Sequence, residues 1–491
     1  MSSFDKLTHH FQSISNLQHA YSMLSWDNAS VMPSGGAEAR SNAIAELSTL
    51  IHQKMTSPAL EELFSEVEAN DTINSASVRE MKRQWSQATV LPEDLVRAKS
   101  IAGTKCEHAW RTQRGDNDWA GFEKNWAEVV KLSQEEAQIR AQAKNTSPYD
   151  AMLDLYEPGT TSESLELVFN DVKSWLPLLI DQVIEKQAFE LVTLPQGHYP
   201  REKQKALGLD VMKLLQFDFE HGRLDESVHP FCGGVPSDVR ITTRYDESEF
   251  IQSLMGIVHE TGHARYEQGL PKSLAGLPAG EARSMGIHES QSLFFEMQIG
   301  RSNPFIAHLA RLAEQHFGSS NSQQFSQDNF QKLYTRVKKD FIRVDADELT
   351  YPAHVILRYE IERDLINGKI KYTDVPELWN QKMQQYMGLS TEGNFKNGCM
   401  QDIHWTDGAF GYFPSYTLGA MYAAQFMAAM RKNIDVDSVI VSGDLTPIFS
   451  WLSDNIWSKG SLLTTDELVK QATGETLNPA HFKDHLRNRY L

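Results

Sequence analysis

The chain has 491 residues, of which 41% are hydrophobic and 23% charged, a composition typical of soluble globular proteins with an ample core. Its 47 basic and 65 acidic residues give a net charge of −18. This balance argues against a nucleic-acid or anionic-membrane surface, because such surfaces need clustered Lys and Arg. The expected partner is a small substrate or another protein.

The three cysteines are scattered and show no CxxC spacing, so neither a disulfide framework nor a thiolate metal site is expected. The sequence begins without a basic segment followed by an apolar run, and it has no stretch of about 18 consecutive apolar residues. These features predict a cytoplasmic protein without membrane contact.

Successive amphipathic helices are predicted over the first part of the chain, about residues 1–190. In residues 161–186, apolar side chains recur at helical spacing after Thr161 and Ser162, either of which can cap the helix. No internal repeat and no Pro- or Ser-rich linker interrupts the sequence. A single domain over residues 1–491 is therefore predicted.

A short strand is predicted from Val239 to Tyr245, where apolar and polar side chains alternate. Arg240, Thr242 and Arg244 share one face of this strand. Two arginines on one face suit an anionic ligand, although a solvated edge strand with protective charges explains the stretch equally well.

Two histidines four residues apart, His259 and His263, lie in a segment whose helix ends are marked in the sequence. Asp246 with Glu249 resembles a capping box, and Gly269 is a stop signal. Four residues advance about 400° around a helix and about 6 Å along it, so both imidazoles can bind the same cation. The spacing predicts a metal site.

Glu260 lies about 100° from that face, where its carboxylate reaches a water on the cation rather than the cation itself. Metal-dependent hydrolases divide the work in this way. The alternative is a polar helix face without metal, but a His-Glu-x-x-His match arises by chance in only about 4% of such chains. Gly262 inside the helix costs about 1 kcal/mol relative to alanine, which indicates a close backbone approach.

A catalytic zinc needs a third protein ligand and an open position for water. Gly269 stands where a metzincin places its third histidine. The remaining candidates downstream are Glu281, His288, Glu289 and Glu296. Glu289 and Glu296 lie seven residues apart on nearly one face of a second predicted helix, and spacing does not choose among the four.

Five motifs follow one another in the second half of the chain: HPF at His229 to Phe231, DVRIT at Asp238 to Thr242, HETGH followed by HESQS, IRVDAD at Ile342 to Asp347, and GCMQDIHW at Gly398 to Trp405. In this order they resemble the carboxypeptidase Taq family of thermostable metallocarboxypeptidases. The catalytic motifs span residues 229–416, and fainter similarity reaches both ends of the chain.

The resemblance implies a mainly α-helical single-domain metallopeptidase, a homodimer with a deep groove and a small β-sheet beside the HExxH helix. It implies His259, His263 and Glu289 as metal ligands and Glu260 as general base. The implied activity is removal of C-terminal residues from peptides with broad specificity. Zn²⁺ is the expected metal, with Co²⁺ and Mn²⁺ as alternatives because such ligands bind several divalent ions.

Three aromatic residues are candidates for contacting the reacting peptide. The tetrahedral oxyanion needs a donor besides the metal, which Tyr412, Tyr416 or His404 can supply, and Tyr416 is preferred. Tyr412 is assigned to substrate binding. The alternative for these side chains is packing in the core with satisfied polar groups.

A carboxypeptidase must also hold a free C-terminal carboxylate, which a bidentate arginine does best. Arg240 and Arg343 are the candidates, and Arg343 has the alternative role of a structural partner for Asp345 or Asp347. Metal-bound histidines usually donate their other N–H to an acceptor. Asp238, Asp402 and His229 are the candidates for orienting the ligands in this way.

Two competing interpretations stay open from the sequence. An oligoendopeptidase on a similar helical fold would lack the carboxylate anchor. A helical scaffold protein would hold a structural metal or none, but Glu260 next to both histidines argues against an inactive protein.

Overall fold

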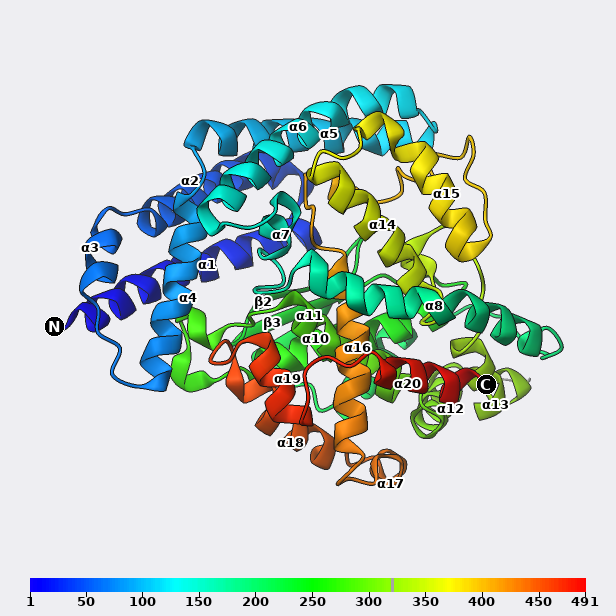
Figure 1. Ribbon diagram of the computed structural model, residues 1–491. Helices are drawn as coiled ribbons and strands as arrows, with labels where there is room; N and C mark the ends of the chain where they lie inside the picture. The colour runs from blue at the N-terminus through cyan, green and yellow to red at the C-terminus, as the bar shows by residue number, and fades with distance from the viewer. Residues whose placement is uncertain (319–321) are drawn as a thin grey trace.

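Helices follow one another through the first part of the computed structural model, which describes residues 1–318 and 322–491. They are α1 (Ser3–Ser30), α2 (Ala37–Met55), α3 (Ala59–Glu66), α4 (Thr72–Thr89), α5 (Glu93–Gly115), α6 (Trp119–Lys144), α7 (Pro148–Leu153) and α8 (Ser162–Gln187). In Figure 1, α1 to α4 lie on the left of the molecule, α5 and α6 lie along its top, and α8 crosses its middle. Of the two capping residues predicted for α8, Thr161 is the cap, since its hydroxyl accepts a hydrogen bond from the Ser164 amide.

Two hydrophobic clusters support these helices. A small one joins α1 to α4 around Leu7, Phe11 and Met81. A much larger one contains buried side chains from Cys106 in α5 to Tyr490 near the C-terminus. The main core therefore spans the N-terminal helices and the rest of the chain.

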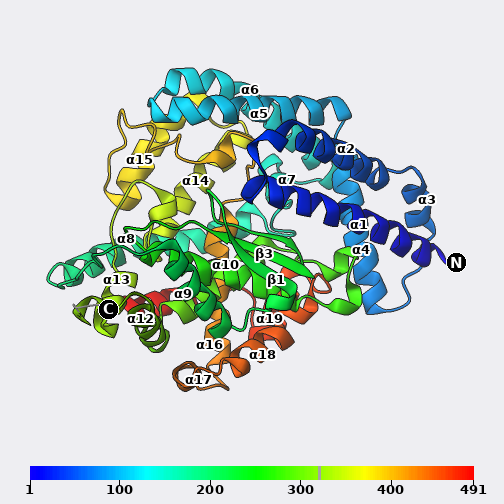
Figure 2. The same cartoon turned by 180° about the vertical axis from the view of Figure 1, so that it is seen from behind.

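Three short strands form one small sheet: β1 (Gly222–Glu226), β2 (Cys232–Val235) and β3 (Asp238–Thr243). The central strand β3 pairs parallel to β1 and antiparallel to β2. Val239 and Ile241 of β3 pack with Ile257 and Ala264 of the next helix, α10. Figure 2 shows the sheet beside α10 at the centre of the molecule, as predicted.

The helix that carries both histidines, α10 (Ile251–Gly269), ends at the predicted residue but begins later than predicted. The predicted capping box is wrong, because the Asp246 carboxylate accepts its hydrogen bond from Ser248. The Glu249 carboxylate accepts from the amide of Ile251 instead, so it caps the first turn from just outside the helix.

Helices also form most of the remainder, and the mainly α fold is confirmed. They are α9 (Arg201–Leu214), α11 (Met285–Leu293), α12 (Asn303–Phe317), α13 (Gln327–Tyr334), α14 (Tyr351–Ile366), α15 (Val375–Met387), α16 (Pro414–Met430), α17 (Val436–Ser442), α18 (Thr446–Asn455), α19 (Thr465–Thr473) and α20 (Ala480–Tyr490). A π-helix, η5 (Phe294–Gly300), continues α11. Within the described residues, no helix is both long and apolar enough to cross a membrane.

Candidate metal centre

The histidines of α10 face a carboxylate on α11. The rings of His259 and His263 lie 5.0 Å apart between centroids, one helical turn from each other. Glu289 places its Oε2 atom 3.4 Å from His263 Nε2. One ligand atom from each of the three residues lies within 4.8 Å of the others, so Glu289 is the candidate that meets both histidines.

Glycines allow the helices around this group to approach closely. A Cβ atom on Gly262 of α10 would lie 2.5 Å from the backbone oxygen of Gln291 and 2.6 Å from Ser292 Cα. The close backbone approach predicted for Gly262 is thus confirmed. On the other side of α11, a Cβ atom on Gly419 of α16 would lie 2.8 Å from Glu289 Cβ. Glu289 is held between α10 and α16.

Both histidines have their Nδ1 atoms occupied by hydrogen bonds. His259 Nδ1 lies 2.8 Å from Glu296 Oε2, and the other oxygen of Glu296 accepts from Arg301 at 2.7 Å. His263 Nδ1 lies 2.7 Å from Nδ1 of His288. Each ring therefore has Nε2 available for a metal. Two of the candidates for the third ligand, Glu296 and His288, contact the Nδ1 atoms of the histidines instead.

The residues predicted to orient the ligands have other contacts, and that prediction is wrong. Asp238 binds Arg240 through both carboxylate oxygens, and Asp402 binds Arg343. His229 is exposed. The hydrogen-bond partners of His259 and His263 come instead from η5 and α11.

Buried carboxylates shift the pKa values of the groups in this centre. Burial raises the pKa of Glu260 to about 7, and the charges of Glu289 and Glu296 add to this effect. Burial lowers the pKa of His259, but the bond to Glu296 and the surrounding carboxylates outweigh it and raise that pKa to about 10. Burial lowers the pKa of His263 to about 4. Two imidazole nitrogens and one carboxylate fit a divalent metal ion.

Four of the residues predicted for catalysis or substrate binding form a second group, the aromatic–arginine cluster, which consists of Arg343, His404, Tyr412 and Tyr416. The His404 ring stacks on Tyr412 with centroids 5.6 Å apart, and its Nε2 lies 3.5 Å from the Tyr416 hydroxyl. The Arg343 guanidinium carbon lies 5.0 Å from the centroid of the Tyr416 ring. Residues from three separate segments thus meet at the start of α16.

This cluster borders the metal ligands through α16. Tyr416 and Gly419 are three residues apart, so they lie on the same side of the helix. Gly419 meets Glu289, as described above. Burial raises the pKa of the Tyr416 hydroxyl well above its usual value, and the charge of Glu289 contributes to the shift. The Tyr416 hydroxyl is therefore within electrostatic range of the proposed ligand.

Tyr351 contacts this cluster, although the sequence motifs did not mark it as a candidate. Its hydroxyl accepts a hydrogen bond from Arg343 Nη1 at 2.6 Å, and its ring lies 5.9 Å from that of Tyr416. The sequence signal was only its position at the start of α14, shortly after the IRVDAD motif. The ion-pair partner of Arg343 is Asp402, rather than either aspartate of that motif.

Arg240 lies apart from this cluster. Its guanidinium group donates to both oxygens of Asp238, at 2.9 and 2.6 Å, and its carbon lies 4.8 Å from the ring centroid of Trp26 in α1. Thr242, predicted to share an outward face with it, is fully buried and bonds Ser227 at 2.7 Å. Of the predicted polar face, Thr242 is therefore covered and Arg240 half-buried, whereas Arg244 is exposed just beyond the end of β3.

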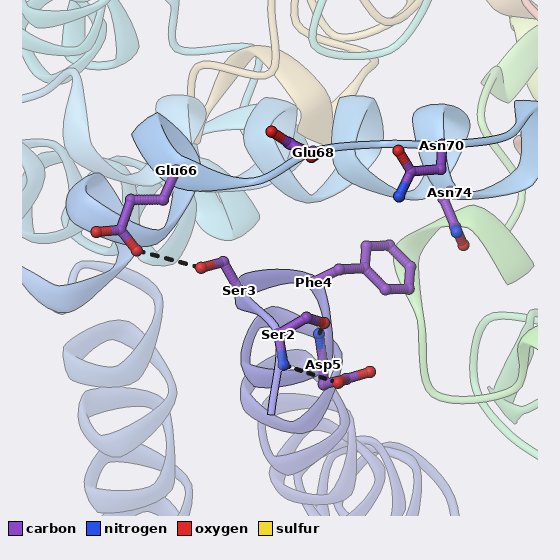
Figure 3. Close-up of a pocket in the computed structure, with 8 residues that line it drawn as sticks. All are labelled: Ser2, Ser3, Phe4, Asp5, Glu66, Glu68, Asn70 and Asn74. Carbon is purple, nitrogen blue, oxygen red and sulfur yellow. Dashed lines mark hydrogen bonds between the residues drawn. The ribbon is translucent and has the colours of Figure 1, made fainter.

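A surface pocket of about 380 Å³ lies at the beginning of α1, away from these groups. Figure 3 shows its lining residues: Ser2, Ser3, Phe4, Asp5, Glu66, Glu68, Asn70 and Asn74. Ser3 donates a hydrogen bond to Glu66 across it. The pocket shares no residue with the metal centre or the aromatic–arginine cluster.

The HExxH helix, the facing Glu289 and the surrounding helical fold define a metallopeptidase of the zincin type. The family model described as Carboxypeptidase Taq (M32) metallopeptidase matches residues 6–490. The chain belongs to this family and is a metallocarboxypeptidase, which confirms the resemblance seen in the motifs.

Relatives match over almost the full length of the chain. Carboxypeptidase 1 of Bacillus subtilis is 37% identical over 483 residues, 97% of this chain and 96% of that protein. Thermostable carboxypeptidase 1 of Thermus thermophilus is 35% identical and covers 95% of this chain and 94% of its own. The solved structure of Trypanosoma cruzi metallocarboxypeptidase 1 has 46% identity and a TM-score of 0.97, with 99% of each chain covered.

Proposed function

We propose that this metallocarboxypeptidase removes C-terminal residues from peptides with broad specificity, using Glu260 as general base and His259, His263 and Glu289 as metal ligands. One observation carries the proposal. Three potential ligand atoms from two helices lie within 4.8 Å of one another, and Glu260 lies beside the first of them in the sequence.

Zn²⁺ is the proposed metal, with Co²⁺ and Mn²⁺ as alternatives, because two imidazoles and one carboxylate suit each of these ions. When bound, the ion supplies a Lewis acid that polarises a carbonyl oxygen and acidifies water. The Nδ1 contacts of His259 and His263 support this proposal because they leave Nε2 of each ring for the metal.

Glu260 is proposed to accept the proton of the attacking water and to pass it to the leaving amine. Its position supports this role, since it follows His259 directly on α10 and is 9% exposed. A carboxylate in such a water-poor site interacts strongly with a nearby proton donor. No other carboxylate of the HExxH helix is adjacent to a proposed ligand.

The aromatic–arginine cluster is proposed to hold the peptide. Tyr416 would donate its hydroxyl hydrogen to the developing oxyanion, and His404 would assist from the same side. Tyr412 would line the substrate site, because its ring packs against both of these side chains. The support is that the three rings pack together and that burial, together with the charge of Glu289, raises the pKa of both tyrosine hydroxyls.

Arg343 is proposed to bind the C-terminal carboxylate of the substrate. It uses Nε and Nη2 for Asp402 and one Nη1 hydrogen for Tyr351, so one hydrogen on each terminal nitrogen is left for a second carboxylate. Arg240 is the alternative, but its known contacts lie with Asp238 and Trp26. Location in the cluster favours Arg343.

A homodimer with a deep groove and a cytoplasmic location completes the proposal. Family resemblance supports the dimer and the groove, and the cysteine content supports a reducing compartment. The strongly acidic composition supports peptides rather than nucleic acids or membranes as partners. Light scattering on the purified protein measures the oligomeric state.

Mass spectrometry of a peptide mixture tests the reaction. We expect the metal-loaded protein to shorten peptides stepwise from the C-terminus. Glu260→Gln should keep its metal and lose activity by about 10²- to 10⁴-fold, the usual contribution of general acid–base catalysis. Metal analysis of both proteins accompanies the assay.

Peptides with amidated C-termini are the matched control. A carboxypeptidase that needs the free carboxylate should process them far more slowly than the free acids, because the charged anchor for Arg343 is missing. Internal cleavage of the amidated peptides at a normal rate would establish an endopeptidase instead.

A further inference from the structure

The two proposed histidine ligands form hydrogen bonds with different kinds of side chain through their Nδ1 atoms. His259 contacts a carboxylate directly, that of Glu296, which is itself paired with Arg301. His263 contacts another imidazole, that of His288, at 2.7 Å between Nδ1 atoms. His288 continues to a carboxylate, since its Nε2 lies 2.8 Å from Glu267 Oε1.

This chain of contacts determines where the protons lie when His263 binds a metal. A neutral histidine that binds through Nε2 carries its hydrogen on Nδ1, so His263 must donate from Nδ1. His288 must then accept at its own Nδ1, and its hydrogen lies on Nε2. Glu267 accepts a hydrogen bond from that Nε2–H and thereby selects the tautomer of His288 that His263 needs.

We propose that His288 and Glu267 are positioning residues that fix the ring orientation and the tautomer of His263 for metal binding. The proposal rests on the metal ligation proposed above and adds two residues that do not touch the metal. Orienting groups of this kind hold ligand rings in place and raise the basicity of the ligand atom.

The chain of contacts from His263 through His288 to Glu267, called the relay below, is held in place by two helices. Glu267 is four residues after His263, so both project from the same side of α10. His288 directly precedes Glu289 on α11. These two neighbouring residues therefore supply one proposed metal ligand, Glu289, and the contact that orients another, His263. The His263 and His288 rings lie 4.7 Å apart, and the buried Tyr266 ring meets His288 edge-on at 5.4 Å. The relay therefore also links the two ligand helices.

Metal affinity and the visible spectrum of Co²⁺-loaded protein test the role of His288. We expect His288→Ala to weaken metal binding by about 10- to 100-fold, as measured by competition with a chelator, and to change the Co²⁺ spectrum. His288→Asn should restore most of the affinity, because its side-chain oxygen lies near the position of the imidazole Nδ1 and can accept from His263. Glu267→Ala should weaken binding in the same direction.

His316→Ala is the matched control, because His316 makes a similar imidazole–carboxylate contact with Asp210 at 2.8 Å, between α12 and α9. It should leave the metal affinity and the spectrum unchanged. Thermal unfolding of the metal-free proteins separates loss of helix packing from loss of ligand orientation. If His288 and Glu267 only help the helices to pack, their alanine variants should have a lower unfolding temperature and an unchanged Co²⁺ spectrum.

His263→Ala separates failure of the relay from failure of the ligand set. If His263→Ala binds metal as well as the native chain, the proposed ligands are wrong. If it loses metal while His288→Ala keeps native affinity and spectrum, the relay alone is wrong. Equal loss in His288→Asn and His288→Ala would overturn the acceptor role of His288, and native affinity in Glu267→Ala would overturn the role of Glu267.

Discussion

Arg343 and Arg240, the two candidates for binding a substrate carboxylate, already bind different groups. Arg343 lies buried beside Tyr416, whereas Arg240 lies over Trp26 and binds Asp238. Lysine keeps the positive charge but loses the planar pair of donors. Substituting each arginine by lysine therefore tests its role with the least disturbance of the ion pairs.

We expect Arg343→Lys to lower kcat/KM for peptides with a free C-terminus by about 10- to 100-fold, the equivalent of a lost charge-assisted hydrogen bond of about 1.5–3 kcal/mol. Arg240→Lys should leave kcat/KM close to the native value. Steady-state kinetics on one peptide in its free-acid form measure both. A large loss in Arg240→Lys with none in Arg343→Lys would reverse the assignment.

At the scale of single residues, the residue types and one helical spacing were enough to predict the group of His259, Glu260 and His263. The family motif pointed to Glu289, which the structure brings within reach of both histidines. The partners behind the histidines could not be predicted, because they depend on how α10 packs against α11 and η5. Spacing along one helix does not encode such packing.

Close packing between helices explains why α10 contains glycine at residue 262. Gly256 lies in the same helix with nothing within 4 Å of an added Cβ atom. Alanine at residue 256 should stabilise the helix by about 1 kcal/mol because it restricts the unfolded chain and favours helix. At residue 262 the added methyl group would meet the backbone of α11, and overpacking costs about 1–3 kcal/mol.

Gly262→Ala is therefore expected to lower the unfolding temperature and Gly256→Ala to raise it. Circular dichroism during heating of the metal-free proteins measures both changes. The pair is matched, since both variants make the same substitution in one helix. An unchanged or higher unfolding temperature for Gly262→Ala would mean that α10 and α11 do not approach as closely as described.

Irregular elements were the ones that sequence patterns missed. The second predicted helix begins as α11 and ends as the π-helix η5. Glu289 of α11 lies near His263, and Glu296 of η5 contacts His259. A π-helix has no periodicity signal distinct from that of an α-helix over so short a segment. Strands β1 and β2 also escaped prediction, since their pairing with β3 decides their conformation more than their composition.

At the scale of the whole molecule, the helical pattern and the motif order predicted the mainly α fold, but not how the last helix docks. Glu348 is almost fully buried and bonds three side chains of α20: His485 at 2.5 Å, Arg489 at 2.8 Å and Tyr490 at 3.1 Å. Burial raises the pKa of Glu348, but the charges of Arg489 and His485 outweigh it and hold the pKa well below its usual range. These partners lie more than a hundred residues away, so no local pattern indicates the contact.

The lowered pKa of Glu348 makes the docking of α20 sensitive to acid. Because the carboxyl binds a proton more weakly in the folded state, its stabilising effect is present above the unfolded pKa of about 4.5 and is lost as the pH falls below it. Glu348→Gln leaves the largely buried Arg489 guanidinium without its carboxylate partner and should cost about 3–5 kcal/mol at neutral pH. Thermal unfolding should show the variant well below the native chain at about pH 7, with the difference narrowing towards about pH 2. Glu392 is exposed, so the control variant Glu392→Gln should unfold at the same temperature as the native chain at every pH. If the unfolding temperatures of Glu348→Gln and the native chain differed by the same amount at every pH, the lowered pKa of Glu348 would be contradicted.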